Sequence, residues 1–444
     1  MAVEPASKTT PPEHRALAPD VALTFASKLS VLVLTVLSTV IVARALGTTG
    51  RGAVAVAFSF TLLLVQFGSF GLQSANPYFA ARDPKQLGRI VSNSLWFALL
   101  FGSVLVLAGI GVKAFFPALL RGLDWLDVIV VLAGIPAALS SVLLQSILIA
   151  EGRVWAYNLV ELGSVLAMVL GLIVGFAAFD MDVLGAICVI VAANVAASIT
   201  YLALLMRHGP AVRAPDPDLA RTMMRYGFRI YVATLIAFML GRVNLILVNA
   251  YHGTSAAGLF AVCIGLAEGL HLLPTVVGLN LFPRVVRGGH FDQSAAVFRT
   301  IALLFAGLCL ITLPLAGPVI TLLYGQDFSG ATTIYYWLLP GIFAYGMLSI
   351  LSQHFAGRGF PRQAMLVWFP GLAINLGIVF VFLPGGPTYV AALAASLAYI
   401  LILILHMRLF AKESGGYRVL VPRPREAITL VGDLLRGLRA RTAQ

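Results

Sequence analysis

Long runs of apolar residues follow one another along the chain with only short polar interruptions. These runs are continuously apolar and do not alternate with period two, so they indicate helices that cross a membrane and not barrel strands. The composition agrees, since 60% of the 444 residues are hydrophobic and only 11% are charged. At about 20 apolar residues per span, we predict an all-α polytopic membrane protein with about 12 crossings: 20–43, 53–75, 90–113, 126–150, 156–178, 183–206, 224–249, 255–281, 297–323, 331–355, 363–383 and 388–410.

Lys and Arg gather on one side of the predicted bundle. With the N-terminus in the cytoplasm, 23 of the 30 basic residues fall in cytoplasmic segments and 4 in outer loops. Basic residues are enriched in cytoplasmic loops, so the bias predicts that both termini lie inside. The same topology accounts for the net charge of +12, and nucleic acid is therefore not expected as a partner.

The segments outside the predicted spans are short or proline-rich. Residues 1–19 contain four prolines and indicate a disordered cytoplasmic tail, and 411–444 form a basic tail whose end fits an amphipathic helix on the membrane surface. The three cysteines, Cys188, Cys263 and Cys309, fall inside predicted spans and offer neither a disulfide framework nor a metal-ligand spacing. We expect no cofactor.

The chain also repeats itself at an offset of 206 residues. This shift places Gly47 on Gly253, Thr48 on Thr254 and Gly52 on Gly258 without a gap. We therefore predict two related six-helix halves, 20–206 and 224–410, joined by a cytoplasmic linker, 207–223.

A bundle of two related halves is typical of transporters that rock one half against the other. No phosphate-binding loop of the type G-x-x-x-x-G-K-[ST] occurs, which argues against an ATP-driven motor in this chain. The predicted loops leave no soluble domain large enough for an ordinary active site, and we expect no enzyme activity. A channel and an integral-membrane glycan enzyme are the weaker alternatives.

Two motifs near the start of the chain carry a family resemblance. The stretches "VARALGTTGRGAVAVA" (42–57) and "FGSFGLQSANPYFAAR" (67–82) resemble the oligosaccharide-flippase (Wzx-type) branch of the multidrug/oligosaccharidyl-lipid/polysaccharide (MOP) exporter superfamily. The resemblance implies a flippase of the bacterial inner membrane. It would move an undecaprenyl-pyrophosphate-linked oligosaccharide by alternating access around a central cavity, for the synthesis of exopolysaccharide or O-antigen.

The resemblance further implies partners and alternatives. Membrane lipids, a coupling proton or sodium ion, and a polysaccharide polymerase with its assembly proteins are the implied partners. A multidrug or cation exporter and a lipid II flippase belong to the same superfamily. Lipid II flippases carry an Arg-Asp pair six and five residues before the arginine of the V-A-R element, where this chain has Ser38 and Thr39, which argues against a peptidoglycan precursor as substrate.

Basic and polar residues inside the spans are the candidates for substrate binding, because an ionisable group in a membrane needs a partner or a wet cavity. Lys28 lies on one helical face with Thr35 and Ser38, and either lines the lumen or extends its ammonium to the headgroups. Arg229 has the same ambiguity. Arg242 lies beyond the middle of its span, with Asn249 seven residues further on the same face. Arginine forks suit the oxygens of a pyrophosphate.

Two further groups are predicted to act with these basic residues. Glu268 lies near the centre of its span with His271 on the same stripe, and we predict that they form a proton or sodium coupling site. The alternative is a structural salt bridge between Glu268 and Arg242. Arg44 and Arg51 flank the first glycine turn on the outer side, where they either receive an anionic headgroup or tie helix ends together.

Overall fold

The structure of the protein is a computed structural model that describes residues 17–207, 214–286, 291–359 and 361–421. Most of the predicted N-terminal tail, part of the linker and the predicted amphipathic tail helix lie outside these residues. The described residues form helices and turns with no strand, so the predicted all-α class is confirmed.

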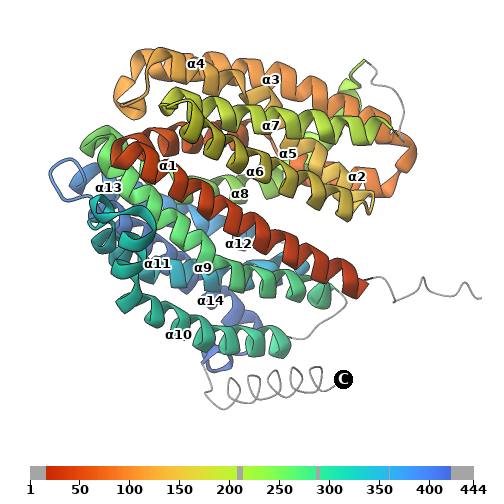
Figure 1. Ribbon diagram of the computed structural model, residues 1–444. Coiled ribbons are helices and arrows are strands. Elements are labelled where there is room, and N and C mark those ends of the chain that lie inside the picture. Colours follow the sequence, from red (N-terminus) through yellow and green to blue (C-terminus); the bar gives the residue numbers. More distant parts are fainter. Residues whose placement is uncertain (1–16, 208–213, 287–290, 360, 422–444) are drawn as a thin grey trace, which may run out of the picture.

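The first half comprises α1 (Leu17–Gly68), α2 (Leu72–Arg82), η1 (Pro84–Gln86), α3 (Leu87–Phe115), η2 (Pro117–Leu120), α4 (Trp125–Ala133), α5 (Ile135–Ala150), α6 (Val154–Ala178) and α7 (Val183–Met206). The second comprises α8 (Pro217–His252), α9 (Thr254–Val286), α10 (Phe291–Tyr324), η3 (Gln326–Phe328), α11 (Ala331–Gly357), α12 (Arg362–Leu366), α13 (Trp368–Phe382), α14 (Tyr389–Ser414) and η4 (Tyr417–Leu420). In Figure 1, α2 to α7 occupy the upper part and α9 to α14 the lower part, whereas α1 runs diagonally from the upper left to the lower right between them.

Eleven helical segments of the described chain are long and apolar enough to cross a membrane. The longest, Ala26–Gly68, has 43 residues and contains the first two predicted spans. Gly47 interrupts it with φ 66° and ψ −168°, a conformation that favours glycine. In Figure 1, α1 begins at the right and α2 lies at the right again, so the chain turns back within α1. Counting α1 twice reconciles the eleven segments with the predicted number.

The second repeat has the same turn. Gly253, which separates α8 from α9, has φ 84° and ψ 175°, close to the values of Gly47. Both predicted repeat positions therefore break their helix pair with one residue in the same conformation. We call the end of the bundle that holds Gly47 and Gly253 the turn end, and the end at which α1 begins and α14 stops the tail end.

The two halves pack on each other at the turn end through repeat-related residues. A Cβ on Gly52 would lie 1.8 Å from the carbonyl oxygen of Thr254, and a Cβ on Gly258 would lie 2.1 Å from the carbonyl oxygen of Thr48. The offset of 206 relates Gly52 to Gly258 and Thr48 to Thr254, so one contact is the symmetry mate of the other. The glycines are needed there because the backbones touch.

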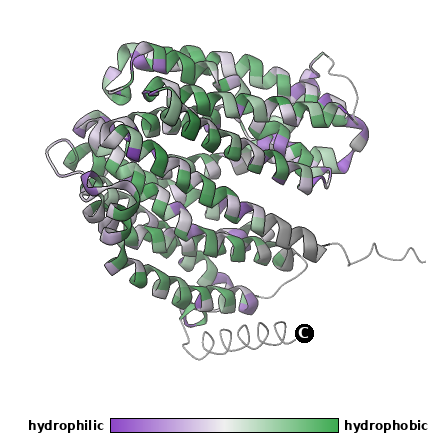
Figure 2. Cartoon of the chain, in the orientation of Figure 1, coloured by the Kyte–Doolittle hydropathy of each residue, from purple (hydrophilic) through white to green (hydrophobic). Residues whose placement is uncertain are grey.

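Apolar residues cover the outer faces of the bundle, as the green ribbons of Figure 2 show, whereas hydrophilic residues of the first half gather toward the tail end. The largest buried apolar cluster draws on both halves. Leu107 and Leu322, by contrast, are exposed over 68% and 74% of their surfaces, as expected for side chains that face lipid. The end of the predicted linker differs from prediction, because α8 begins at Pro217 and the last residues of 207–223 are therefore helical.

Candidate functional site: a cavity between the halves

A cavity of about 230 Å3 lies between the two halves. Its walls come from α1, α6 and α7 of the first half and from α8 and α9 of the second. Thr35, Ser38 and Thr39 from the predicted polar stripe of α1 are among its lining residues. We call this the central cavity.

Arg242 on α8 and Glu268 on α9 form an ion pair on the wall of the central cavity. Their side chains keep 24% and 46% of their surfaces exposed, so water and solutes reach them. The structure therefore brings together the two intramembrane charges that the sequence singled out in this half. A pair that lines a cavity is accessible to a competing anion or cation, unlike a pair sealed between helices.

A second cavity of about 200 Å3 lies within the second half, among α8, α9, α11 and α14. Arg242 and Glu268 line this cavity as well as the central one. His271 also lines it, with Nε2 at 3.1 Å from the carbonyl oxygen of Ile342 and its ring 4.7 Å from the ring of Tyr345. The ion pair thus joins the central cavity to a second compartment that contains the predicted coupling histidine.

Arg51 is the most unusual charge in the cavity wall. The sequence placed it in an outer loop, but it lies inside α1, four residues after Gly47, with only 8% of its surface exposed. Its Nε has no hydrogen-bond partner in the described residues. Glu268, Arg242 and the hydroxyl of Tyr324 are close enough to act on it electrostatically. Two arginines therefore share one carboxylate in this part of the cavity.

Tyr324, at the end of α10, contacts the cavity wall from behind. Its hydroxyl lies 3.2 Å from the hydroxyl of Thr39, a residue of the cavity wall. Nothing in the sequence singles out Tyr324, because a tyrosine at the end of a span is ordinary at a membrane interface. Only the fold places it beside Arg51.

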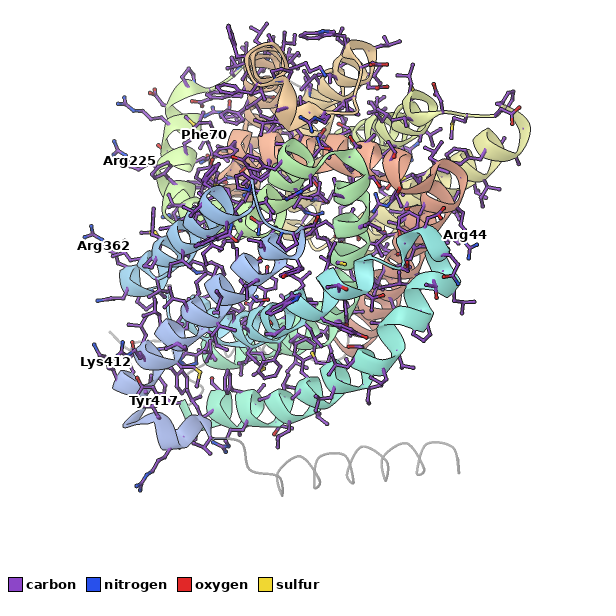
Figure 3. All side chains as sticks on the ribbon, turned by 90° about the vertical axis from the view of Figure 1, so that its left-hand side faces the viewer. Arg44, Phe70, Arg225, Arg362, Lys412 and Tyr417 are labelled. Carbon is purple, nitrogen blue, oxygen red and sulfur yellow. The ribbon has the colours of Figure 1, made fainter. Side chains whose placement is uncertain are left out.

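Arg44 and Asn249 do not line either cavity; both bind carbonyl groups at the turn end. Arg44 donates from Nε to the carbonyl oxygen of Leu323 at 2.9 Å and from a terminal nitrogen to that of Leu322. Figure 3 shows Arg44 at the edge of the bundle. In this conformation Arg44 ties α1 of the first half to the end of α10 in the second.

Asn249 joins the halves in the converse way, from a helix of the second half to a loop of the first. It is fully buried and donates from Nδ2 to the carbonyl oxygens of Leu119 at 3.2 Å and Arg121 at 3.0 Å. Thr254 adds a hydrogen bond to the Arg121 carbonyl at 3.1 Å. These bonds attach α8 and α9 to the loop that contains η2, so the turn end is closed by contacts between the halves.

Lys28 lies further toward the tail end and is paired as well. Its Nζ lies 2.7 and 2.8 Å from the two carboxylate oxygens of Glu161 on α6 and also donates to the hydroxyl of Tyr157. The sequence reasoning missed Glu161, although an acid five residues after the start of the predicted span 156–178 carries the same kind of signal as Glu268. Arg229 belongs to α8, but its side chain is not among those described.

Comparisons with known proteins agree with this architecture. The family described as polysaccharide biosynthesis protein matches residues 17–288, which is more than half of the chain. A search of curated proteins gave no match.

Three solved structures share the fold at low sequence identity. The lipid II flippase MurJ in an inward closed conformation has a TM-score of 0.71 at 13% identity, covering 88% of this chain and 90% of its own. A multidrug resistance MATE family transporter of the MOP superfamily, inward-facing, has a TM-score of 0.68 at 14% identity, covering 88% and 98%. A MOP superfamily transporter from Pyrococcus furiosus, whose binding pocket is described as reversed in polarity, has a TM-score of 0.60 at 15% identity, covering 90% and 96%.

Proposed function

The chain belongs to the polysaccharide biosynthesis protein family and is a multi-pass membrane protein with the MOP transporter fold, and from this premise we propose that it flips a lipid-linked oligosaccharide. The substrate would be an undecaprenyl-pyrophosphate-linked glycan, moved from the inner to the outer leaflet of a bacterial inner membrane by alternating access. The two termini would lie in the cytoplasm. A polysaccharide polymerase and its assembly proteins would act on the product.

The observation that carries this proposal is the excess of positive charge in the wall of the central cavity. Arg51 is buried with an unpartnered Nε beside a single Arg242–Glu268 pair. One carboxylate cannot fully compensate two buried or half-buried guanidinium groups, and a poorly compensated charge in a membrane is costly. An anionic ligand would lower that cost. Pyrophosphate suits the site because guanidinium groups bind phosphate oxygens in pairs. A carrier of organic cations would instead need an excess of acid.

Glu268 supplies the coupling in this proposal. When the pyrophosphate engages Arg242, Glu268 loses its partner, and a carboxylate without a partner in a membrane binds a proton or a sodium ion more readily. His271 lines the second cavity together with Glu268, and in this proposal the cation reaches Glu268 through that cavity. If the ion binds the inward-open and outward-open conformations with different affinity, its binding would then bias which end of the bundle opens.

The turn end would face outward in this scheme. The carbonyl ties of Arg44 and Asn249 would hold the outer gate closed while substrate enters from the cytoplasmic side. When the outer gate opens, both side chains lose their carbonyl partners and become available to the departing headgroup. Lys28 and Arg229 complete the set of basic side chains that we propose contact the substrate.

The proposal is tested by measuring the amount of surface glycan in cells that depend on this protein for glycan export. Arg242→Ala and Glu268→Gln should each abolish glycan export and cause the lipid-linked intermediate to accumulate, at unchanged amounts of protein in the membrane. Lys412→Gln is a matched control, because Lys412 is exposed on the perimeter of the bundle (Figure 3). Unchanged export in both cavity variants, or a change in drug resistance without a change in glycan, would overturn the proposal.

A further inference from the structure

The Lys28–Glu161 pair lies at the tail end of two walls that lead into the central cavity. On α1, Leu32, Thr35 and Thr39 line the cavity at offsets of 4, 7 and 11 residues from Lys28. On α6, Met168 and Leu172 line it at offsets of 7 and 11 from Glu161. These offsets keep each set on one helical face. The pair is therefore the continuation of the cavity walls toward the end from which substrate would enter.

The pair is not required to hold α1 against α6. Nearer the turn end, Val42 of α1 packs with Leu172 of α6 and Ile190 of α7 in an apolar cluster whose members are almost completely buried. The Lys28 and Glu161 side chains, by contrast, keep 37% and 23% of their surfaces exposed. Ion pairs this accessible contribute little to stability. Packing joins the two helices, and the charges are free for another role.

Lys28 is also fully occupied in the described structure. An ammonium group has three donors, and here they meet the two Glu161 oxygens and the Tyr157 hydroxyl, with the Tyr157 ring 4.9 Å below the nitrogen. Glu161 fills, with two oxygens, the place that two phosphate oxygens would take.

We propose that Lys28, Tyr157 and Glu161 form a separate docking site for the phosphate oxyanion of a lipid-linked substrate, with Glu161 as the competitor that occupies Lys28 until substrate arrives. The headgroup binds here first, displaces the Glu161 carboxylate, and then moves along the α1 stripe to Arg242 and Arg51. This inference rests on the proposed function, since it assumes an anionic substrate, but it concerns a different site, formed by α1 and α6 nearer the tail end.

The competition predicts that substitutions of Lys28 and Glu161 change the affinity for the substrate in opposite directions. Lys28→Gln removes the cation and should weaken binding of undecaprenyl pyrophosphate about tenfold, the value of one charge-assisted hydrogen bond. Glu161→Gln removes the competitor and should tighten binding by several fold. The double variant should behave as Lys28→Gln, because the gain needs the lysine. A purely structural pair would instead make both single variants weaker or less stable.

The test is a titration of undecaprenyl pyrophosphate into the full-length protein in phosphatidylcholine nanodiscs, with melting temperatures measured in parallel. Lys28→Arg should bind as the wild type does, which keeps the proposal falsifiable if Lys28→Gln does not fold. Lys412→Gln is the control for loss of one exposed lysine. Phosphatidylglycerol, titrated in the same way, distinguishes the substrate from an ordinary bilayer lipid.

Tighter binding of undecaprenyl pyrophosphate by Glu161→Gln, with no change for phosphatidylglycerol, is the expected result. An equal gain for both lipids would overturn the docking site in favour of a bilayer contact. No effect at Lys28 and Glu161, together with lost binding in Arg51→Gln and Arg242→Gln, would overturn this inference and leave the proposed function standing. No effect in any of the four variants would overturn both.

Discussion

The two glycine turns have the same backbone but different charges. Gly47 and Gly253 share one conformation, and Gly52 and Gly258 share one close packing. At the position after the first turn the chain buries the guanidinium of Arg51, and at the repeat-related position it buries the methyl group of Ala257, which is 0% exposed. The second half shows that the turn folds without a charge there. The guanidinium of Arg51 is therefore retained for something other than packing.

The largest effect should come from the part that the two turns share. Gly52→Ala and Gly258→Ala would each place a Cβ within about 2 Å of a carbonyl oxygen in the other half, and an alanine needs well over 3 Å. Both variants should lose most of their folded protein, measured as the monodisperse peak after detergent extraction. Gly307→Ala, whose Cβ would meet nothing within 4 Å, should extract as the wild type does. Normal folding of either turn variant would show that the repeat contact is dispensable.

The next largest effect should come from Arg51, the charge that distinguishes the first glycine turn from the second. Arg51→Ala should lower glycan translocation about 100-fold, since it removes a charged contact worth roughly 1.5–3 kcal/mol in a site of low dielectric, while the melting temperature should stay equal or rise. Its counterpart, Ala257→Arg, should destabilise the protein, because Ala257 is fully buried in the apolar core and a guanidinium would have to displace its neighbours. If Arg51→Ala lowers the melting temperature as much as it lowers transport, the guanidinium is structural after all.

Asn249 tests the contacts that close the turn end. Asn249→Ala removes two hydrogen bonds to the loop carbonyls of Leu119 and Arg121 and should destabilise the closed turn end by about 1–2 kcal/mol. Cysteine labelling at Ser255, which bonds to Thr48 across the seam at 2.8 Å, should become faster. Arg82→Gln, far from the turn end, serves as the control. Unchanged labelling would contradict a gating role for this tie.

The smallest effect on translocation should come from Tyr324, which lies beside Arg51. Tyr324→Phe removes only the hydroxyl that lies 3.2 Å from Thr39, so it should lower translocation two- to fivefold, in line with about 0.5–1 kcal/mol for one neutral hydrogen bond. Tyr336 lies near the start of α11, which follows the end of α10, and its hydroxyl donates to the carbonyl of Leu313. Tyr336→Phe should have no effect on translocation. Equal losses in both variants would indicate a general effect on folding.

The fold was largely predictable from the sequence, because spanning helices are set by local apolar runs and the repeat by glycines that both halves need. The eleven segments fall where the twelve apolar runs were predicted, since the longest segment contains the first two runs. The repeat offset located both glycine turns. The candidate site was predictable only in part. Glu268 and Arg242 stood out because each is costly in a membrane alone, but their pairing depends on how α8 packs against α9.

Arg51 and Tyr324 show the limit of sequence reasoning most clearly. From the sequence we predicted Arg51 to be a loop residue, because glycines surround it. The neighbouring residues carry no sign that the second half buries its side chain. Tyr324 lies 273 residues further along the chain and reaches Arg51 only through the closure of the turn end. Contacts between the halves arise from tertiary packing. Hydrophobic periodicity and charge counts along the sequence do not predict such contacts.

The central claim is that the central cavity carries an anionic lipid-linked headgroup on Arg51 and Arg242. The most direct measurement is flipping of a fluorescent undecaprenyl-pyrophosphate-linked oligosaccharide in proteoliposomes that contain the full-length protein. We predict that the wild type flips this lipid, that Arg51→Ala loses flipping at an unchanged melting temperature, and that a neutral lipid-linked analogue is not flipped by either. Equal flipping of the neutral analogue by the wild type and by Arg51→Ala would contradict the account.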